Sequence, residues 1–199
     1  MSESIPVIGP SAEPAAASAA PALLASPPAA GAASTPVGGG GAVPSGPVEW
    51  RWRRFDDLTV FELQNIYRAR QQVFTLEQQC IYLDADGYDE PAFHLAAWAE
   101  GVREPLAYAR LVDPGWKYPE ASIGRVITAA AQRGTGLGRE LLRRMLAHAD
   151  GVFPAHGLRI SAQSRLEGFY AAEGFRIVGE RYIEDGIWHT EMVRAAVAR

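Results

Sequence analysis

Three glycines at alternate positions give the first sign of chemistry in this sequence, in the run Arg133-Gly134-Thr135-Gly136-Leu137-Gly138. The run joins a strand-like stretch at 122–128 to a helical pattern. Unpaired backbone N–H groups and the positive end of the helix dipole meet at such a junction, and glycine lets an anion approach closely. The spacing fits neither the dinucleotide pattern G-x-G-x-x-G nor a Walker loop. Taken alone, the run indicates either an anion site or a plain glycine-rich turn.

A second segment, Phe169-Tyr170-Ala171-Ala172-Glu173-Gly174-Phe175, begins 31 positions after Gly138. Together the two segments resemble the GNAT acyltransferase family, whose cofactor-binding and late helix motifs have this form and separation. The similarity covers essentially all of 49–199. Further residues resemble the ElaA-like branch of that family: Arg70, Val73-Phe74, Glu77-Gln78, Cys80, Tyr82, Asp84, Asp86, Ile123-Gly124-Arg125-Val126, Glu184-Asp185-Gly186-Ile187, His189 and Met192.

The resemblance implies a GNAT-like α/β fold, with a mixed, mainly antiparallel twisted sheet flanked by helices. It also implies transfer of an acetyl group from acetyl-CoA to a primary amine of a small molecule, peptide or protein, by direct attack and without a metal. The residues implied in cofactor binding are Val126, Ile127 and Thr128 along the pantetheine arm, and Arg133, Gly134, Thr135, Gly136, Leu137, Gly138 and Arg139 around the diphosphate. An amide near Val126 would polarise the thioester carbonyl. Gln163 stands where many relatives have a cofactor-contacting asparagine, and its longer side chain makes that contact less secure.

Such a transfer needs one group that removes a proton from the amine and another that protonates the departing thiolate. Tyr170 matches the position at which many family members carry the acid, although an aromatic pair here could instead pack a helix on the sheet. For the base, His189 has a suitable intrinsic pKa, and Glu120 precedes the cofactor strand and could act through water. His94, on an earlier strand, is a further candidate.

Three aspartates in the segment 80–91 resemble the beginning of a calcium loop: Asp84, Asp86 and Asp89. The glutamate and the helix pair of an EF-hand are missing, so we expect these carboxylates to orient a cationic substrate or to cap a turn. Cys80 is the single cysteine, which excludes an intramolecular disulfide and a cysteine-based zinc site. It has no adjacent basic cluster, and we expect it to be inert.

Periodicity and turn residues predict the elements that must position these side chains. Strands are expected at 49–55, 93–99, 105–112, 122–128, 158–162, 175–182 and 188–194, and helices at about 59–74, from 137 to a C-cap at Gly151, and at 165–173. Thr59 and Glu62 predict a capping box at the first helix. This order is typical of an α/β domain with a mixed sheet.

Composition divides the chain near residue 48. Residues 1–48 hold 13 Ala, 9 Pro, 7 Gly and 7 Ser and offer almost nothing large to bury, which predicts a disordered tail before a domain at 49–199. A secretory signal is disfavoured because no basic region precedes the apolar stretch and prolines interrupt it. Translation from near Val48 is a third reading.

The remaining bulk properties narrow the function. The 199 residues carry a net charge of −4 and include no apolar run of roughly 18 residues, so neither nucleic acid nor a membrane is expected as a partner. A cytoplasmic location fits the single cysteine, and a homodimer is left open. Two classes of function remain: an amine acetyltransferase, and a noncatalytic CoA-binding or partner-binding module with the same fold.

Overall fold

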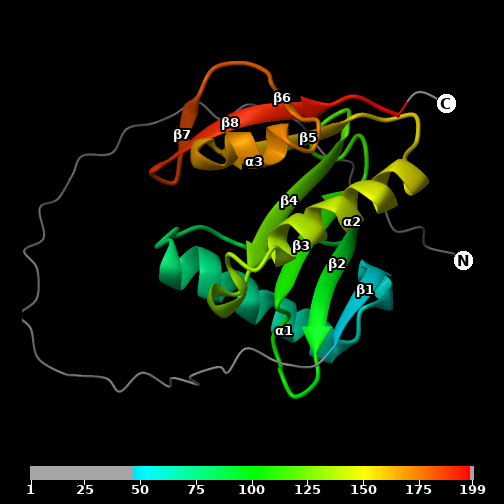
Figure 1. Cartoon of the computed structure of the whole chain (residues 1–199), viewed down its shortest axis with the longest axis vertical. Coiled ribbons are helices and arrows are strands. Elements are labelled where there is room, and N and C mark those ends of the chain that lie inside the picture. The colour runs from blue at the N-terminus through cyan, green and yellow to red at the C-terminus, as the bar shows by residue number, and fades with distance from the viewer. Residues whose placement is uncertain (1–46, 198–199) are drawn as a thin grey trace, which may run out of the picture. The chain divides into compact units, whose positions relative to one another are not determined.

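The computed structural model of the chain describes residues 47–197 (Figure 1). The tail predicted over 1–48 therefore lies outside the described residues, except at its end, where Val48 already belongs to the first strand. The described strands are β1 (Val48–Arg54), β2 (Ala92–Ala99), β3 (Ala107–Val112), β4 (Ala121–Thr128), β5 (Leu158–Gln163), β6 (Arg176–Ile177), β7 (Tyr182–Glu184) and β8 (Ile187–Arg194). The α-helices are α1 (Val60–Gln71), α2 (Leu137–Val152) and α3 (Glu167–Ala171). None of the helices within this range is long and apolar enough to cross a membrane.

Within residues 47–197, the eight strands form one sheet in the order β1-β2-β3-β4-β5-β8-β6, with β7 paired to β8. All pairings are antiparallel except that of β4 with β5, which is parallel. This parallel pairing covers only Ala121 with Leu158 and Ser122 with Arg159. The mixed, mainly antiparallel sheet predicted above is confirmed, and the ladder between its two central strands stops soon after it begins.

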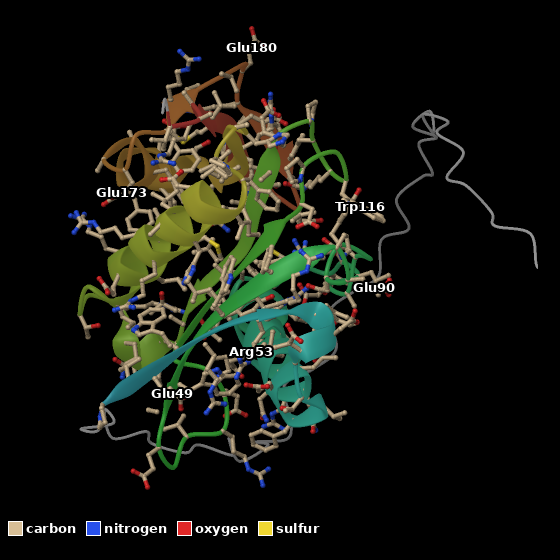
Figure 2. The ribbon with its side chains drawn as sticks, turned by 90° about the vertical axis from the view of Figure 1, so that its right-hand side faces the viewer. Glu49, Arg53, Glu90, Trp116, Glu173 and Glu180 are labelled. Atoms are coloured by element: carbon tan, nitrogen blue, oxygen red, sulfur yellow. The ribbon has the colours of Figure 1, made fainter. Side chains whose placement is uncertain are left out.

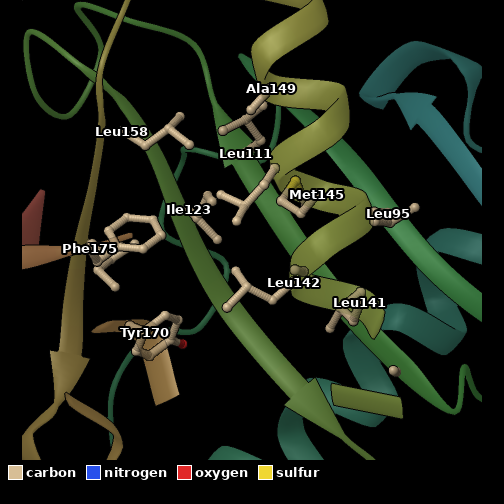
Figure 3. Close-up of a cluster of buried hydrophobic side chains, with 14 of the residues drawn as sticks. Leu95, Leu111, Ile123, Leu141, Leu142, Met145, Ala149, Leu158, Tyr170 and Phe175 are labelled. Carbon is tan, nitrogen blue, oxygen red and sulfur yellow. The ribbon is translucent and has the colours of Figure 1, made fainter. Parts of the chain in front are cut away.

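The two long helices cover opposite faces of the sheet (Figure 1). Side chains alternate between the faces along a strand, so β2 sends Leu95 and Ala97 to one side and Ala96 and Trp98 to the other. The first pair joins a core with the apolar stripe of α2, namely Leu141, Leu142, Met145, Leu146 and Ala149 (Figure 3). The second pair packs with Ile66 and Ala69 of α1. Each such large buried side chain contributes roughly 1.5–3 kcal/mol to stability, which fixes the helices on the sheet.

The capping box at the start of α1 is confirmed. The Thr59 hydroxyl accepts the backbone N–H of Glu62, and the Glu62 carboxylate accepts the backbone N–H of Thr59. The end of this helix differs from the prediction, because an α-helix stops at Gln71 and a π-helical segment, Gln72–Glu77, follows. The chain then leaves the helix through Gln79, whose φ is +57°.

Three other expectations about elements differ from the structure. Gly151 does not cap α2, because the helix continues to Val152 and its C-cap is Phe153, whose ring packs edge-on against Phe93. The strand predicted at 175–182 is divided into β6 and β7, because the left-handed Gly179, with φ +81°, turns the chain between them. The helix predicted at 165–173 is shortened to α3, after a 3-10 turn at Ser164–Leu166.

Candidate active site

The glycine run forms a tight turn between β4 and α2. Gly134 and Gly136 adopt φ values of +79° and +94°, which L-residues with a side chain rarely adopt, and Gly136 is the N-cap of α2. A Cβ atom on Gly138 would lie 3.1 Å from Oγ1 of Thr128, so the first turn of α2 packs tightly on the end of β4. The N-terminus of a 16-residue helix, with its unpaired N–H groups, is thus presented by backbone that only glycine forms without strain.

This turn borders a cavity of about 1090 Å³ between β4 and β5. Most residues expected at the site line it: Val126, Ile127, Thr128, Arg133, Gly134, Gly136, Gly138, Arg139, Gln163, Tyr170 and His189. Thr135 and Leu137 do not. The Thr135 hydroxyl donates to the carbonyl of Gln132 at 2.8 Å and so closes the turn, and the Leu137 side chain packs against the core.

A bulge interrupts β4 in the middle of this cavity. Tyr108 pairs with Ile127 and Arg110 with Gly124, so that two β4 residues, Arg125 and Val126, face one residue of β3. Arg125 has a φ of +53°, which is uncommon for a residue with a side chain. The bulge breaks the ladder near Val126, where the family resemblance implies an amide that would polarise the thioester carbonyl. A backbone amide left out of the ladder is available to face a ligand.

Tyr170 lies at the junction of the core and the cavity. Its ring packs edge-on against Phe169 and Phe175, with centroids 5.1 and 5.9 Å apart, and the residue is only 6% exposed. Figure 3 shows Tyr170 and Phe175 together at the border of the core cluster. Burial raises the pKa of the Tyr170 hydroxyl to about 12, so this group keeps its proton at neutral pH.

His189 faces the cavity from β8, opposite Gln163 of β5. Its Nδ1 lies 2.9 Å from the carbonyl oxygen of Ile187. A carbonyl can only accept, so Nδ1 carries the proton and the neutral ring has its lone pair on Nε2. The ring stacks on Tyr182 at 6.1 Å, which fixes its orientation. In the neutral ring, Nε2 is therefore the atom that can accept a proton.

The other two base candidates lie elsewhere. Glu120 is outside the cavity lining, and its carboxylate accepts two hydrogen bonds from Arg159, at 2.9 and 3.1 Å, which lower its pKa. His94 is buried, with Nδ1 2.8 Å from the Tyr108 hydroxyl and Nε2 3.0 Å from the carbonyl of Asp89. Both ring nitrogens of His94 are engaged, so it does not serve as a base for a substrate.

Comparisons with known proteins agree on one family. The model of the acetyltransferase (GNAT) domain matches residues 72–196. The chain belongs to the GNAT acetyltransferase family. A UPF0039 protein of Synechocystis is 41% identical over 73% of this chain and 94% of that protein, and ElaA of Escherichia coli is 34% identical over 75% and 98%.

Solved structures give the same result. The structure of an acyl-CoA N-acyltransferase from Pseudomonas aeruginosa has a TM-score of 0.71 and 38% identity, and covers 75% of this chain and 100% of that one. That of Escherichia coli ElaA has a TM-score of 0.70 and 34% identity, over 74% and 99%. These comparisons confirm the GNAT fold, the ElaA-like branch and the N-acetyltransferase activity that were predicted from the sequence.

The aspartates of this GNAT enzyme form a buried ionic network rather than a binding site for a cationic substrate. Arg70, fully buried on α1, bonds Asp84 at 2.8 Å and Asp89 at 2.7 Å. Arg110 of β3 bonds Asp86 and Asp89, and Arg125 of the bulge bonds Asp84 and Asp86, at distances from 2.7 to 2.9 Å. Three positive charges thus balance three negative ones. The network attaches the 80–91 loop to the bulge and corrects the expectation from sequence.

The expectation of a turn-capping aspartate is confirmed at one position. Asp86 accepts the backbone N–H of Tyr88 through Oδ1 at 3.2 Å. Burial alone would raise the pKa of Asp86. The hydrogen bond from Arg110 and the positive charges of Arg110 and Arg125 outweigh that effect and hold the pKa at about 2. Within residues 47–197, no group of three or more His, Cys, Asp or Glu side chains is arranged to hold a metal ion.

The end of the π-helical segment, Glu77, and its C-cap, Gln78, contact residues that line the cavity. The Glu77 carboxylate pairs with the Arg133 guanidinium, whose Nε also donates to the Thr128 carbonyl at 3.1 Å. The Gln78 amide oxygen accepts from Nε2 of Gln163 at 2.9 Å. Three groups that were expected to bind the cofactor, namely the Arg133 guanidinium, the Thr128 carbonyl and the Gln163 amide, thus form hydrogen bonds within the protein. The resemblance to the ElaA-like branch included Glu77 and Gln78, but nothing local in the sequence indicated these partners.

Proposed function

We propose that this GNAT enzyme transfers an acetyl group from acetyl-CoA to a primary amine, by direct attack in a ternary complex. The observation that carries the proposal is the left-handed glycine turn at the N-terminus of α2, beside a cavity that also contains Tyr170 and His189. The diphosphate is a dianionic group of the kind that such a turn accepts. The cavity, at about 1090 Å³, has room for a pantetheine arm together with an acceptor.

The residues present fit the donor. The backbone N–H groups of the turn 134–138 would hold the diphosphate, and Arg139, which lies on the first turn of α2 and lines the cavity, would add charge-assisted hydrogen bonds. Arg133 would join them after leaving Glu77. The backbone of β4 at 126–128 would pair with the amides of the pantetheine arm, because β4 has no pairing with β5 beyond Ser122. The donor supplies an activated acetyl thioester.

The proton transfers follow from the states of the two side chains. His189 would accept a proton from the attacking amine at Nε2, because its Nδ1 proton is held by the Ile187 carbonyl. Tyr170 would donate its hydroxyl proton to the leaving sulfur, since this residue lines the cavity and its hydroxyl is protonated at neutral pH. Glu120 has no part in this scheme, because its carboxylate lies outside the cavity and is paired with Arg159.

Turnover separates this function from that of a noncatalytic CoA-binding module. Thiol release from acetyl-CoA would be followed with a panel of amines: small diamines, amino acids and peptides with free N-termini or lysines. Calorimetry on the same preparation would measure the affinity for acetyl-CoA. We expect binding together with amine-dependent thiol release. Binding without release for any amine, and without acetylated product by mass spectrometry, would identify a noncatalytic module. Absence of binding would overturn the proposed donor site.

A further inference from the structure

Lys117 is the only lysine among the 199 residues, all other basic side chains except histidine being arginine. It lies on the loop between β3 and β4 and contributes to the wall of the cavity. Its neighbour Trp116 is 62% exposed and lies on the outside of the molecule (Figure 2). The one primary amine that any side chain of this protein carries is therefore placed in the cavity where we expect acetyl transfer.

The Lys117 amine is not held by a carboxylate. Within the described part of the chain it makes no ion pair, and its Nζ lies over the ring of Tyr118, 5.4 Å from the centroid. Its electrostatic neighbours are balanced: Glu184 and Asp86 favour the ammonium, while Arg125 and Arg110 oppose it. These carboxylates act at a distance, and Asp86 is already paired with both arginines. Within the described residues, no carboxylate therefore fixes the position of this amine.

The surroundings also favour the reactive form of the amine. The residue as a whole is exposed, yet burial of its charged group lowers the pKa of the Lys117 ammonium below its ordinary value. A lower pKa increases the fraction of neutral amine at a given pH, and only the neutral amine has a lone pair for attack. Arginine cannot replace lysine in this role, because a guanidinium stays charged at any physiological pH.

We propose that Lys117 is an intramolecular acetyl acceptor, so that the enzyme acetylates a lysine in the wall of its own cavity. This inference rests on the function proposed above. The Nζ lone pair forms a bond to the thioester carbonyl carbon, and the carbon–sulfur bond breaks. The sulfur leaves with the bonding pair and takes up one proton, while the nitrogen gives one proton to the base and keeps the other as the amide N–H. The products are an Nε-acetyl-lysine and CoA with a free thiol.

Acetylation would change the charge and the shape of the cavity wall around Lys117. It removes one positive charge and lengthens the side chain, while the carboxylates of Glu184 and Asp185, which also line the cavity, remain. Added acceptor amines would compete with Lys117 for the same acetyl group. Modification of Lys117 would therefore be slower in the presence of a good external acceptor.

Trypsin digestion gives a direct readout. In the unmodified chain, trypsin cleaves after Arg110, Lys117 and Arg125, which yields the peptides 111–117 and 118–125. Acetylation blocks cleavage after Lys117, so the modified chain yields one peptide, 111–125, heavier by an acetyl group. Full-length protein incubated with acetyl-CoA and no acceptor should accumulate this peptide, and the mapping distinguishes it from acetylation of the N-terminal amine.

Three controls decide whether the reaction is enzymatic and intramolecular. The urea-unfolded chain and Gly136→Val should form peptide 111–125 at least about tenfold more slowly, because neither holds the thioester beside the amine. Lys117→Arg should show no acetylation in 111–125. The rate constant should not change when the protein is diluted, whereas a rate constant proportional to protein concentration would contradict transfer within one molecule.

The outcomes separate this inference from the proposed function. If external amines are acetylated but 111–125 never appears, the self-acetylation is wrong and the acetyltransferase function stands. If the unfolded chain reacts as fast as the folded one, the modification is merely chemical and the inference is overturned. If neither Lys117 nor any amine is acetylated although acetyl-CoA binds, both the inference and the proposed function fail.

Discussion

The carboxylate of Glu77 pairs with the guanidinium of Arg133, and the two residues, 56 positions apart in the sequence, both line the cavity. Arg133 is expected to bind the diphosphate. The Glu77 carboxylate therefore competes with the diphosphate for the Arg133 guanidinium. The pair is partly exposed, at 48% for Arg133 and 27% for Glu77.

Glu77→Gln should therefore tighten binding of acetyl-CoA. The variant frees Arg133 and removes a negative charge near the diphosphate site. A partly exposed ion pair contributes roughly 0.2–1 kcal/mol, so we expect the Kd to fall by up to about fivefold in calorimetry. Glu104→Gln is the matched control, because Glu104 pairs with Arg68 outside the cavity lining. An unchanged or higher Kd for Glu77→Gln would show that Glu77 does not compete with the donor.

Gly136→Val should weaken acetyl-CoA binding by more than about tenfold, or roughly 1.4 kcal/mol. A Cβ atom there would meet no neighbour within 4 Å, so the cost comes from the φ of +94° and from displacement of the turn rather than from a clash within the protein. Gly151→Ala, in the same helix and at an ordinary φ, controls for general effects and should leave the Kd unchanged. Equal affinity in a folded Gly136→Val protein would move the donor site elsewhere.

Tyr170→Phe should lower the single-turnover rate by a factor of roughly 10²–10⁴ while acetyl-CoA still binds. The phenylalanine keeps the contacts with Phe169 and Phe175, so the melting temperature should change little. Tyr82→Phe is the comparison, because Tyr82 also lines the cavity and has a pKa raised to about 12 by burial. If Tyr82→Phe loses the activity and Tyr170→Phe keeps it, the acid is assigned to the wrong tyrosine.

The stability of the domain should fall as pH decreases from 6.5 to 4. Burial lowers the pKa of His94 from 6.5 to about 4, so in this window the unfolded chain takes up a proton that the folded chain does not. The full contribution is present above pH 6.5, and about 3 kcal/mol is lost by pH 4. Asp86 adds only about 0.3 kcal/mol by pH 4, because its pKa changes from 3.8 in the unfolded chain to about 2 in the folded one, and most of its contribution is lost at lower pH.

Urea unfolding at several pH values would test this. His94→Gln should be less stable than the wild type at pH 7.5, since it disturbs the contacts with Tyr108 and Asp89, but its free energy of unfolding should vary less between pH 6.5 and 4. His156→Gln, at an exposed histidine, should keep the slope of the wild type. If the free energy of unfolding of His94→Gln varied with pH as much as that of the wild type, the pH dependence would have to come from another group.

Much of the fold was predictable because it depends on residues close together in the sequence. The capping box needs only Thr59 and Glu62, three positions apart, and the start of α2 needs only the glycine turn and the apolar stripe behind it. The end of α2 was not predictable in this way, because its C-cap, Phe153, packs edge-on against Phe93 of β2, which is distant in the sequence.

The cavity itself was determined by the tertiary structure. The sequence alone indicated a phosphate-binding turn and, through the resemblance, an acid at Tyr170, because both are carried by short contiguous motifs. The partners of Glu77 and Gln78, 56 and 85 positions away, and the pairing of Arg125 with Asp84, 41 positions away, depend on which strands become neighbours in the sheet. Lys117 shows the same limit: its sequence context indicates only a turn, and the place of that turn beside β4 puts the single lysine in the wall of the cavity.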